Sequence, residues 1–173
     1  MAVLADRVEA LIRDIPDFPK PGVMFKDITP FLADGPVFGE LVHSWAQAHD
    51  GVDVVAGIEA RGFILAAPVS TELGVGFVPV RKEGKLPGLT SRASYALEYG
   101  EATLEMTADA VTAGQRVLLI DDVLATGGTV AAAIQLLEAA GADVVAVQVL
   151  IELTFLGGRG RLGGRGVDAT VVV

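Results

Sequence analysis

The sequence predicts an α/β fold in which a mostly parallel, twisted sheet is flanked by helices, and three observations lead to this prediction. Short runs of Val, Ile and Leu alternate with segments of helical periodicity along most of the 173 residues. The composition is 51% hydrophobic but only 6% aromatic, which is typical of buried parallel strands packed with aliphatic side chains. The length suits one domain with one core, and we find no linker or internal repeat within residues 1–173.

The N-terminal part is expected to contain two amphipathic helices separated by an irregular segment. The first helix is predicted over residues 4–15, where apolar residues recur at helical intervals, and Pro16 is expected to end it. Two prolines and a glycine exclude both a helix and a central strand from residues 17–22. The second helix begins at residues 34–36. Its apolar side is formed by Phe38, Leu41, Val42 and Trp45.

The remaining chain is expected to alternate strands with helices. Strands are predicted at residues 52–58, 75–80, 117–120, 144–153 and 169–173, and helices at residues 61–73 and 129–140. Such alternation implies right-handed crossovers, which bring successive strands into one mostly parallel sheet.

Three segments interrupt this alternation. Residues 81–92 are polar and aperiodic, so a long loop is expected, and long loops in compact domains are usually functional. Residues 94–98 and 102–106 are predicted to form a hairpin. The Gly/Arg-rich residues 157–166 resemble an RNA-binding segment superficially, but they are few and the chain is acidic. We therefore interpret them as a flexible surface connection.

Composition and charge exclude several classes of protein. The net charge of −9 argues against a general nucleic-acid-binding surface, which needs clustered Lys and Arg. No apolar run approaches the roughly 18–20 residues of a membrane span. Asp6, Arg7 and Glu9 interrupt any apolar signal segment, and the absence of cysteine excludes a disulfide framework and a thiol nucleophile. A cytoplasmic protein with no membrane partner is therefore expected.

The strongest functional signal is residues 117–129, Val-Leu-Leu-Ile-Asp-Asp-Val-Leu-Ala-Thr-Gly-Gly-Thr. A buried strand ends in Asp121 and Asp122, and small residues then lead into a helix, at the sheet edge where ligands of parallel sheets bind. Backbone N–H groups at the helix N-terminus favour a phosphate, whereas two carboxylates suit sugar hydroxyls. A ribose 5-phosphate satisfies both halves. The alternative, a capped junction without function, leaves two adjacent acids to repel each other.

This segment resembles the motif of type I phosphoribosyltransferases that binds 5-phosphoribosyl-1-pyrophosphate (PRPP). Three further segments resemble the adenine phosphoribosyltransferase family: residues 18–30 (FPKPGVMFKDITP), residues 57–63 (GIEARGF), and residues 81–88 (RKEGKLPG) continuing to 94–100 (SYALEYG). The resemblance covers residues 17–158. It implies the type I phosphoribosyltransferase fold with a small N-terminal hood over the active site. It also implies a purine salvage enzyme that transfers the 5-phosphoribosyl group of PRPP to adenine, giving AMP and pyrophosphate.

The resemblance also implies roles for individual residues. The ribose and 5-phosphate of PRPP would be bound by Asp121, Asp122, Ala125, Thr126, Gly127, Gly128 and Thr129. Pyrophosphate would be bound by Arg61, Lys82, Lys85 and Tyr99, with Lys85 a candidate for acting on a neighbouring subunit. Adenine would be held by Met24, Phe25, Leu124 and Leu156. Glu98 would be the catalytic residue, which exchanges a proton near N7 of the base.

The remaining implications concern the cofactor, the assembly and the backbone. Mg²⁺ would be carried by PRPP without a direct protein ligand, the protein would be a homodimer, and the peptide bond between Glu59 and Ala60 would be cis. Lys26 stands where arginine is common in the family, and residues 89–93 match the family poorly. His43 and His49 lack metal-ligand spacing and are interpreted as helix-surface residues.

Two alternatives to an adenine enzyme remain. Enzymes of this fold that act on 6-oxopurines typically carry aspartate at the position of Ala125, which counts against a hypoxanthine–guanine enzyme, and the match over residues 18–30 counts against an orotate enzyme. A PRPP-sensing regulator of the same fold would need an effector surface, such as a basic face, and the acidic sequence gives no sign of one.

Overall fold

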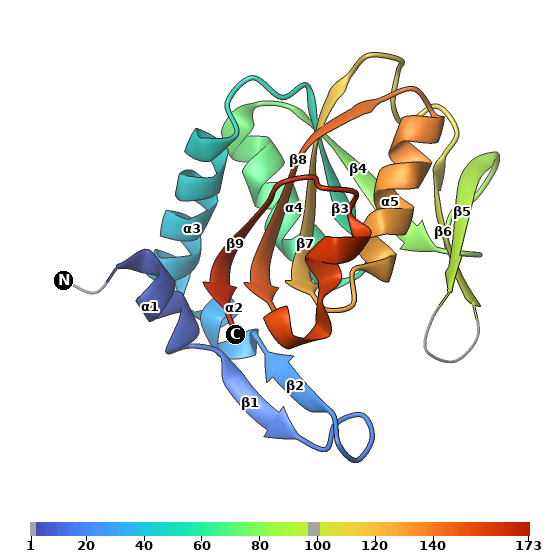
Figure 1. The fold of residues 1–173 in the computed structure, drawn as a ribbon. Coiled ribbons are helices and arrows are strands. Elements are labelled where there is room, and N and C mark those ends of the chain that lie inside the picture. The colour runs from blue at the N-terminus through green and yellow to red at the C-terminus, as the bar shows by residue number, and fades with distance from the viewer. Residues whose placement is uncertain (1–2, 97–100) are drawn as a thin grey trace.

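A seven-stranded sheet forms the centre of the computed structural model, which describes residues 3–96 and 101–173 (Figure 1). The strand order is β5 (Thr90–Ala96), β6 (Glu101–Thr107), β4 (Gly76–Lys82), β3 (Val54–Ile58), β7 (Arg116–Leu124), β8 (Asp143–Glu152) and β9 (Val167–Val172). Strands β4, β3, β7, β8 and β9 run parallel, and β5 and β6 pair antiparallel at one edge. The predicted mostly parallel sheet is confirmed.

Helices cover both faces of this sheet (Figure 1). Helix α5 (Gly128–Ala139) lies on one face, and α4 (Arg61–Leu73) with α3 (Gly35–Ala48) lies on the other. Because strand side chains alternate between faces, β7 contributes to both cores. Its Val117 and Leu119 pack with α5, whereas Leu118 and Ile120 pack with α3 and α4. The sequence therefore reads as a continuous apolar run, as expected for a strand buried on both sides.

The N-terminal segment differs from its prediction. Helix α1 (Leu4–Glu9) ends well before Ile15, and the following residues form strand β1 (Arg13–Pro16). This strand pairs antiparallel with β2 (Met24–Asp27), in a register that sets Ile15 opposite Phe25. The spacing of the apolar residues fits a helix, but the pairing with β2 determines the local structure instead. Figure 1 shows this hairpin beyond the carboxyl ends of β7, β8 and β9, in the position expected for the hood.

Residues 17–22 form the turn between these two strands, as their prolines and glycine predicted. The peptide bond between Phe18 and Pro19 is cis. The side chain of Asp17 accepts a hydrogen bond from the backbone N–H of Gly22 at 2.8 Å. After β2, the short helix α2 (Thr29–Ala33) leads into α3.

Helix α3 begins where the sequence predicted it. The Asp34 side chain accepts a hydrogen bond from the N–H of Val37 at 3.0 Å, which caps the helix. Trp45 is buried, and its Nε1 donates a hydrogen bond to Thr170 Oγ1 on β9 at 2.9 Å. This bond fixes the helix to the far edge of the sheet.

The interpretation of His49 as a surface residue is wrong. It follows the last turn of α3, is only 9% exposed, and its Nε2 lies 2.9 Å from Gln148 Oε1 on β8. The chain turns inward at the helix end and carries the imidazole against the sheet. His43 is exposed as predicted, and its Nδ1 lies 2.9 Å from Glu72 Oε1.

The predicted long loop over residues 81–92 is shorter in the structure. Strand β4 extends to Lys82 and β5 begins at Thr90, so residues 83–89 form the connection. Polar residues extend these strands because they lie at the antiparallel edge, where the apolar pattern of a central strand is not required. The predicted hairpin is confirmed in its strands, β5 and β6, while the residues 97–100 that join them lie outside the described part of the chain.

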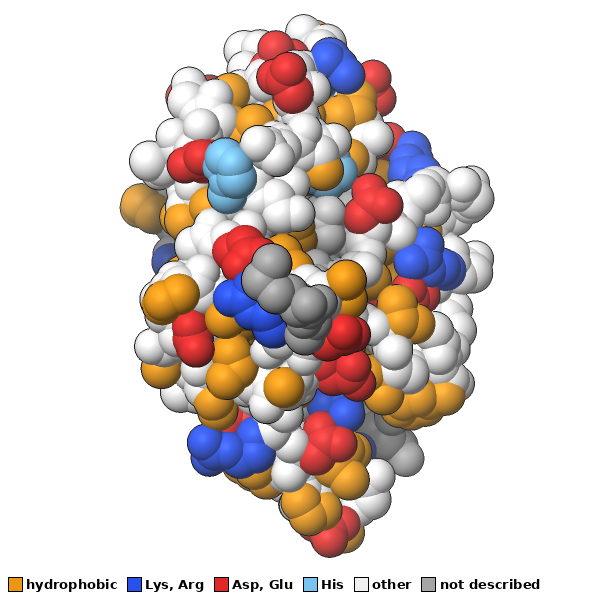
Figure 2. All heavy atoms as spheres, turned by 90° about the vertical axis from the view of Figure 1, so that its left-hand side faces the viewer, with side chains coloured by type: hydrophobic (Ala, Val, Ile, Leu, Met, Phe, Trp, Pro, Cys, Tyr) orange, Lys and Arg blue, Asp and Glu red, His pale blue; other side chains and the backbone are white. Residues whose placement is uncertain are grey.

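The face of the molecule seen in Figure 2 carries charges of both signs. On the face built largely by α1 and α3, acidic and basic side chains lie among apolar ones (Figure 2). Several form ion pairs between elements, such as Arg7 of α1 with Glu40 of α3. None of the helices in the described part of the chain has both the length and the apolar character that a membrane crossing needs.

Candidate functional site

A cavity of about 520 Å³ lies at the carboxyl ends of β3, β4 and β7. It brings together residues that are far apart in the sequence and were expected to bind different parts of one ligand. The lining residues are Glu59, Ala60, Arg61, Lys82, Ala102, Leu104, Asp121, Asp122 and Thr129. Carboxylates and cations therefore face a shared space at the edge where parallel sheets bind ligands.

A smaller cavity of about 70 Å³ lies beside it, along the loop from β7 into α5. It is lined by Asp121, Val123, Leu124, Ala125, Thr126, Gly127, Gly128, Thr129 and Val130. Gly127 has a φ of +80°, a conformation that favours glycine, and α5 begins at the next residue. The first-turn N–H groups of α5 thus lie at the positive end of the helix dipole, where an anion is stabilised. Asp121 and Thr129 line both cavities.

Asp121 and Asp122 are buried at this edge, with exposed fractions of 8% and 6%. Asp121 Oδ1 accepts the backbone N–H of Asp122 at 2.8 Å. Burial raises the pKa of Asp121 well above its ordinary value, and the neighbouring charge of Asp122 raises it further. Burial also raises the pKa of Asp122, although the guanidinium of Arg61 acts in the opposite direction.

One oxygen of this pair has no hydrogen bond within the described residues. Asp122 Oδ2 is buried, and Arg61 Nη2 lies 2.7 Å away without the alignment of a hydrogen bond. This oxygen therefore has the charge of Arg61 beside it but retains an unused capacity to accept a hydrogen bond.

Arg61 connects this acid pair to the hood. It is the first residue of α4 and follows the peptide bond between Glu59 and Ala60, which is cis as expected. Its Nη1 donates a hydrogen bond to the carbonyl of Lys26 at 3.0 Å, and its guanidinium lies 4.8 Å from the centroid of the Phe25 ring. One side chain thus contacts the acid pair, the backbone of β2 and an aromatic ring of the hood.

The residues expected to hold adenine are spread over three elements. Phe25 of β2 is half-buried, and the Phe18 ring lies edge-on to it at 5.1 Å between centroids. Met24 is exposed, and so is Leu156, which lies in a short 3₁₀ helix η1 (Thr154–Leu156). Leu124 is buried in the core and lines the smaller cavity. Met24, Phe25 and Leu156 line neither of the two cavities.

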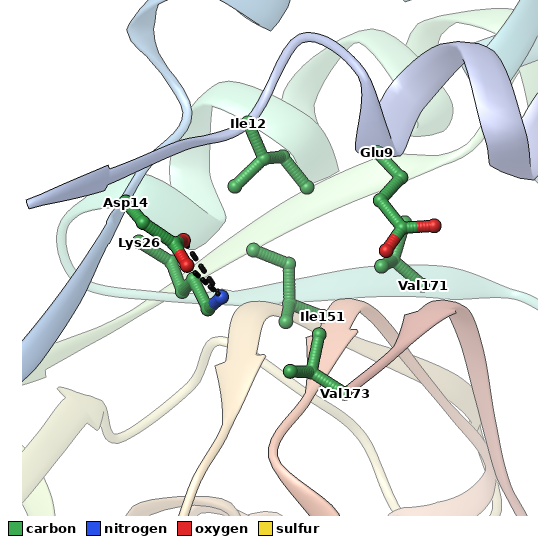
Figure 3. A pocket seen from close by; sticks show the side chains of 7 residues that line it. All are labelled: Glu9, Ile12, Asp14, Lys26, Ile151, Val171 and Val173. Atoms are coloured by element: carbon green, nitrogen blue, oxygen red, sulfur yellow. Dashed lines mark hydrogen bonds and ion pairs between the residues drawn. The ribbon is translucent and has the colours of Figure 1, made fainter.

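The side chain of Lys26 points to the opposite side of β2 from that of Phe25, as successive strand residues do, and it lines a separate pocket. This pocket has a volume of about 320 Å³ (Figure 3). It is lined by Glu9, Ile12, Asp14, Lys26, Ile151, Val171 and Val173. The ammonium of Lys26 lies 2.7 Å from Asp14 Oδ1 and bridges the two strands of the hood. The backbone carbonyl of Lys26 accepts a hydrogen bond from Arg61, which lines the larger site cavity. The side chain of Lys26 lines neither of the two site cavities.

Of the residues in the 81–100 region that were expected to bind pyrophosphate or to act in catalysis, the structure places one in the cavity. Lys82 lines it, whereas Lys85 lies on the exposed loop that follows. Glu98 and Tyr99 lie outside the described residues.

Gly158 is a site residue that the sequence interpretation missed. It belongs to a second 3₁₀ helix, η2 (Gly158–Arg161), inside the segment that was expected to be a flexible connection. A Cβ atom at this position would come well inside 3.0 Å of the Ala125 carbonyl and within 3.1 Å of the Gly127 nitrogen. The backbone of Gly158 therefore supports the loop over residues 125–129 directly. No sequence signal marks this position, because glycine has no side chain whose chemistry could suggest a role.

Residues 157–166 are mostly exposed, as expected of a surface connection, but the segment includes η2 and ion pairs join it to the rest of the protein. Arg159 donates two hydrogen bonds of 2.6 Å to the carboxylate of Glu152 at the end of β8. The hydrogen bonds that Arg159 donates to Glu152 raise the pKa of its guanidinium, which therefore stays charged. Arg165 pairs with Glu138 of α5. Two of the three arginines of this segment, Arg159 and Arg165, thus bind carboxylates of the protein itself.

Comparison with known proteins agrees with this geometry. The family described as "Phosphoribosyl transferase domain" matches residues 32–161. The adenine phosphoribosyltransferase of Salinispora arenicola is 56% identical over 172 residues, which are 98% of this chain and 92% of that protein.

Solved structures resemble the whole fold. The crystal structure of adenine phosphoribosyltransferase from Thermoanaerobacter pseudethanolicus has a TM-score of 0.94 at 48% identity, with 98% of this chain and 99% of that chain covered. The enzyme from Saccharomyces cerevisiae, complexed with adenine and D-2,5-dideoxy-2,5-imino-altritol 1,6-bisphosphate, has a TM-score of 0.92 at 36% identity. The alignment covers 98% of this chain and 99% of that one.

Proposed function

The chain belongs to the family of adenine phosphoribosyltransferases, and on that premise we propose how its residues carry out the transfer of the 5-phosphoribosyl group from PRPP to adenine, giving AMP and pyrophosphate. The observation that supports the assignment most is the meeting of Asp121, Asp122 and Arg61 beside the N-terminus of α5. The N-terminus of α5 suits a phosphate, the two carboxylates suit the hydroxyls of a sugar, and the cation suits a pyrophosphate. The whole chain, residues 1–173, is proposed to act as one catalytic domain.

The ribose 5-phosphate is proposed to occupy the loop between β7 and α5. The phosphate would be bound by the backbone N–H groups of Ala125, Thr126, Gly127, Gly128 and Thr129 and by the hydroxyls of the two threonines. Asp121 and Asp122 would accept hydrogen bonds from the ribose hydroxyls, with Asp122 Oδ2 as the acceptor that now lacks a donor. Fixing both ends of the sugar aligns its C1 for attack by the base.

The pyrophosphate group is proposed to bind Arg61 and Lys82, with Lys85 and Tyr99 added from the segment that follows β4. Breaking the bond at C1 places negative charge on the departing pyrophosphate, and fixed cations stabilise that charge. Arg61 is paired with Asp122 in this structure, so binding of PRPP would exchange that partner for phosphate oxygens.

Mg²⁺ is proposed to arrive with PRPP. The described residues contain no group of three or more His, Cys, Asp or Glu side chains able to hold a metal ion, so the donor set fits an ion bound mainly by substrate oxygens and water. When bound, Mg²⁺ neutralises charge that develops on the pyrophosphate.

Adenine is proposed to lie against Phe25 of the hood. The backbone of Met24 would read the amino edge of the base, and Leu124 and Leu156 would complete the pocket. The Arg61 guanidinium now lies over the Phe25 ring, so the base would use the face that Arg61 leaves when it turns to pyrophosphate. Glu98 is proposed to exchange a proton near N7 of the base.

We also propose a homodimer and a cytoplasmic location. The dimer rests on the family resemblance, in which Lys85 can act on the neighbouring subunit. The location rests on the resemblance and on a sequence that contains no cysteine.

The assignment of substrates predicts a simple selectivity. Purified protein with Mg²⁺ and PRPP is expected to form a nucleotide with adenine, and not with hypoxanthine, guanine or orotate. Ala125 supports this result, because a 6-oxopurine enzyme needs an acidic group there. Binding of PRPP without turnover of any base would instead identify a PRPP sensor, which is the rival function.

Replacement of Arg61 by lysine is expected to lower kcat/KM for PRPP by about 10- to 100-fold. Lysine keeps the charge but lacks the planar guanidinium, which can bond the Lys26 carbonyl and pyrophosphate oxygens with separate nitrogens. Initial rates measured over a range of PRPP concentrations test this. Arg165→Lys, at an exposed ion pair with Glu138, is the matched control and should behave as wild type. Equal kinetics of the two variants would remove Arg61 from the proposed site.

A further inference from the structure

Glu105 is a buried carboxylate outside every role described so far. It lies on β6 and is only 1% exposed, although glutamate is rarely found fully buried without partners. Its Oε1 accepts two backbone hydrogen bonds, from the N–H of Lys85 at 2.8 Å and from the N–H of Leu86 at 3.0 Å. Arg92 Nε lies 3.7 Å from its second oxygen. A buried charged side chain thus holds the loop that carries Lys85.

The charge state of Glu105 suits this task. Burial by itself raises the pKa of a carboxyl group, but the N–H groups of Leu86 and Lys85 and the side chain of Thr90 bond the ionised form. Together with Arg92 they leave the pKa of Glu105 below its ordinary value. The carboxylate therefore stays ionised and accepts strong, charge-assisted hydrogen bonds from the loop.

The same loop is also held by Arg81. Arg81 lies on β4 directly opposite Glu105 on β6. Its Nη1 donates a hydrogen bond to the carbonyl of Lys85 at 3.0 Å, and its Nε lies 3.2 Å from Glu59 Oε2. The N–H and the carbonyl of Lys85 are thus both bound by charged side chains. These bonds fix the backbone of Lys85 and so the direction in which its side chain projects from the loop.

Glu59 extends this arrangement to the other cations of the site. Its Oε2 also accepts the backbone N–H of Lys82 at 3.0 Å, and it stands two residues before Arg61. Glu105 and Arg81 are thus linked through the backbone of Lys85, and Arg81 is linked to Glu59 by an ion pair. These contacts involve the segments that carry Arg61, Lys82 and Lys85, the three described cations assigned to pyrophosphate.

We propose that Glu105 is a positioning residue for PRPP, which with Arg81 and Glu59 sets the backbone of residues 82–86 so that Lys82 and Lys85 meet the pyrophosphate group. This inference rests on the proposed function of the site. This positioning role explains why a charged residue is buried on β6: the carboxylate determines where a surface loop presents its cations. It applies whether Lys85 acts on its own subunit or on the neighbouring one.

The test compares ligands that differ in the pyrophosphate group. Glu105→Ala removes the acceptor of both N–H groups, and the loop backbone is expected to shift. Misplacement of binding groups by about 1 Å is enough to reduce activity by about 100-fold, so we expect KM for PRPP to rise by about 10- to 100-fold. KM for adenine and the Kd for AMP, which lacks the pyrophosphate, should stay within about twofold of wild type, while the Kd for pyrophosphate rises with KM for PRPP.

Two further variants separate positioning from general stability. Glu105→Gln keeps an oxygen that accepts the Lys85 and Leu86 N–H groups, and it is expected to restore most of the PRPP affinity. Glu83→Gln changes an exposed carboxylate that pairs with Arg92 at 2.7 Å but holds no described loop N–H group, so it should behave as wild type. If Glu105→Ala does not fold, Arg81→Lys tests the same contacts, since lysine replaces the two separate donors, Nε to Glu59 and Nη1 to the Lys85 carbonyl, with a single nitrogen.

The outcomes distinguish this proposal from the proposed function. A wild-type protein that forms no AMP overturns the function itself. Wild-type AMP formation together with an unchanged KM for PRPP in Glu105→Ala overturns the positioning role. An equal loss of affinity for AMP and for pyrophosphate also overturns it, because Glu105 would then support the fold as a whole. A selective loss for pyrophosphate and PRPP, recovered in Glu105→Gln, supports the role.

Discussion

Replacing Gly158 with alanine is expected to reduce kcat/KM for PRPP by about 100-fold or more. The added Cβ would collide with the carbonyl of Ala125 and crowd the Gly127 nitrogen, and these are backbone atoms that cannot turn aside. The loop that binds the 5-phosphate must then move as a whole. Overpacking of this kind destabilises a protein by about 1–3 kcal/mol, so the melting temperature should fall as well. Initial rates against PRPP concentration and thermal unfolding measure the two effects.

Gly160→Ala is the matched control for this variant. Gly160 lies two residues further along η2, and an added Cβ would meet no atom within 4 Å there. Its kinetics and melting temperature should equal those of wild type. A Gly158→Ala protein with wild-type KM for PRPP would show that the loop does not depend on this contact.

Replacing Asp121 with asparagine is expected to change activity and stability in opposite directions. Asparagine keeps Oδ1, which accepts the N–H of Asp122, but it removes the charge that a ribose hydroxyl would meet. We expect kcat/KM for PRPP to fall by about 100-fold. The melting temperature at neutral pH should rise by ~2–4 °C, the shift that about 1 kcal/mol produces in a chain of this size. The variant gains this stability because a neutral amide replaces a carboxyl group whose ionised form is disfavoured by burial and by the charge of Asp122.

The pH dependence of this stability gain has a definite sign. Burial and the charge of Asp122 raise the pKa of Asp121 in the folded state above its ordinary value of 3.8. Its contribution to stability is therefore complete below that ordinary value and is lost as pH rises through the raised one. Wild type should lose stability relative to Asp121→Asn as pH rises from about 4 through neutral. Melting temperatures across this range, with Asp109→Asn at an exposed position as control, give the comparison. A difference that does not vary with pH would contradict the prediction.

Much of this fold is predictable because a few local patterns carry it. The apolar runs at β3, β7 and β8 are long enough to be recognised as buried strands, and the helix over residues 61–73 was predicted at its actual bounds. The acids and small residues after the β7 run predicted the edge of the sheet where the cavity lies. In each case the residues that determine the structure are neighbours in sequence.

The errors arise where residues far apart in sequence determine the structure. Ile15 fits a helical spacing, yet pairing with Phe25 places it in a strand. His49 looked like a polar helix end, but Gln148 receives it inside the protein. Gly158 carries no chemical group, so only its close approach to Gly127 reveals its importance. No local pattern encodes any of these three contacts.

Trp45 makes the packing of the protein observable by fluorescence. It is the only tryptophan in the sequence, it is buried, and its indole N–H is bonded to Thr170 across the gap between α3 and β9. Its emission should therefore be blue-shifted in the folded protein and move to longer wavelength when α3 separates from the sheet. Trp45 lines neither site cavity, so PRPP and adenine should leave this signal nearly unchanged. The unfolding of every variant described above can be followed by this intrinsic signal, without an added dye and in the presence of substrates.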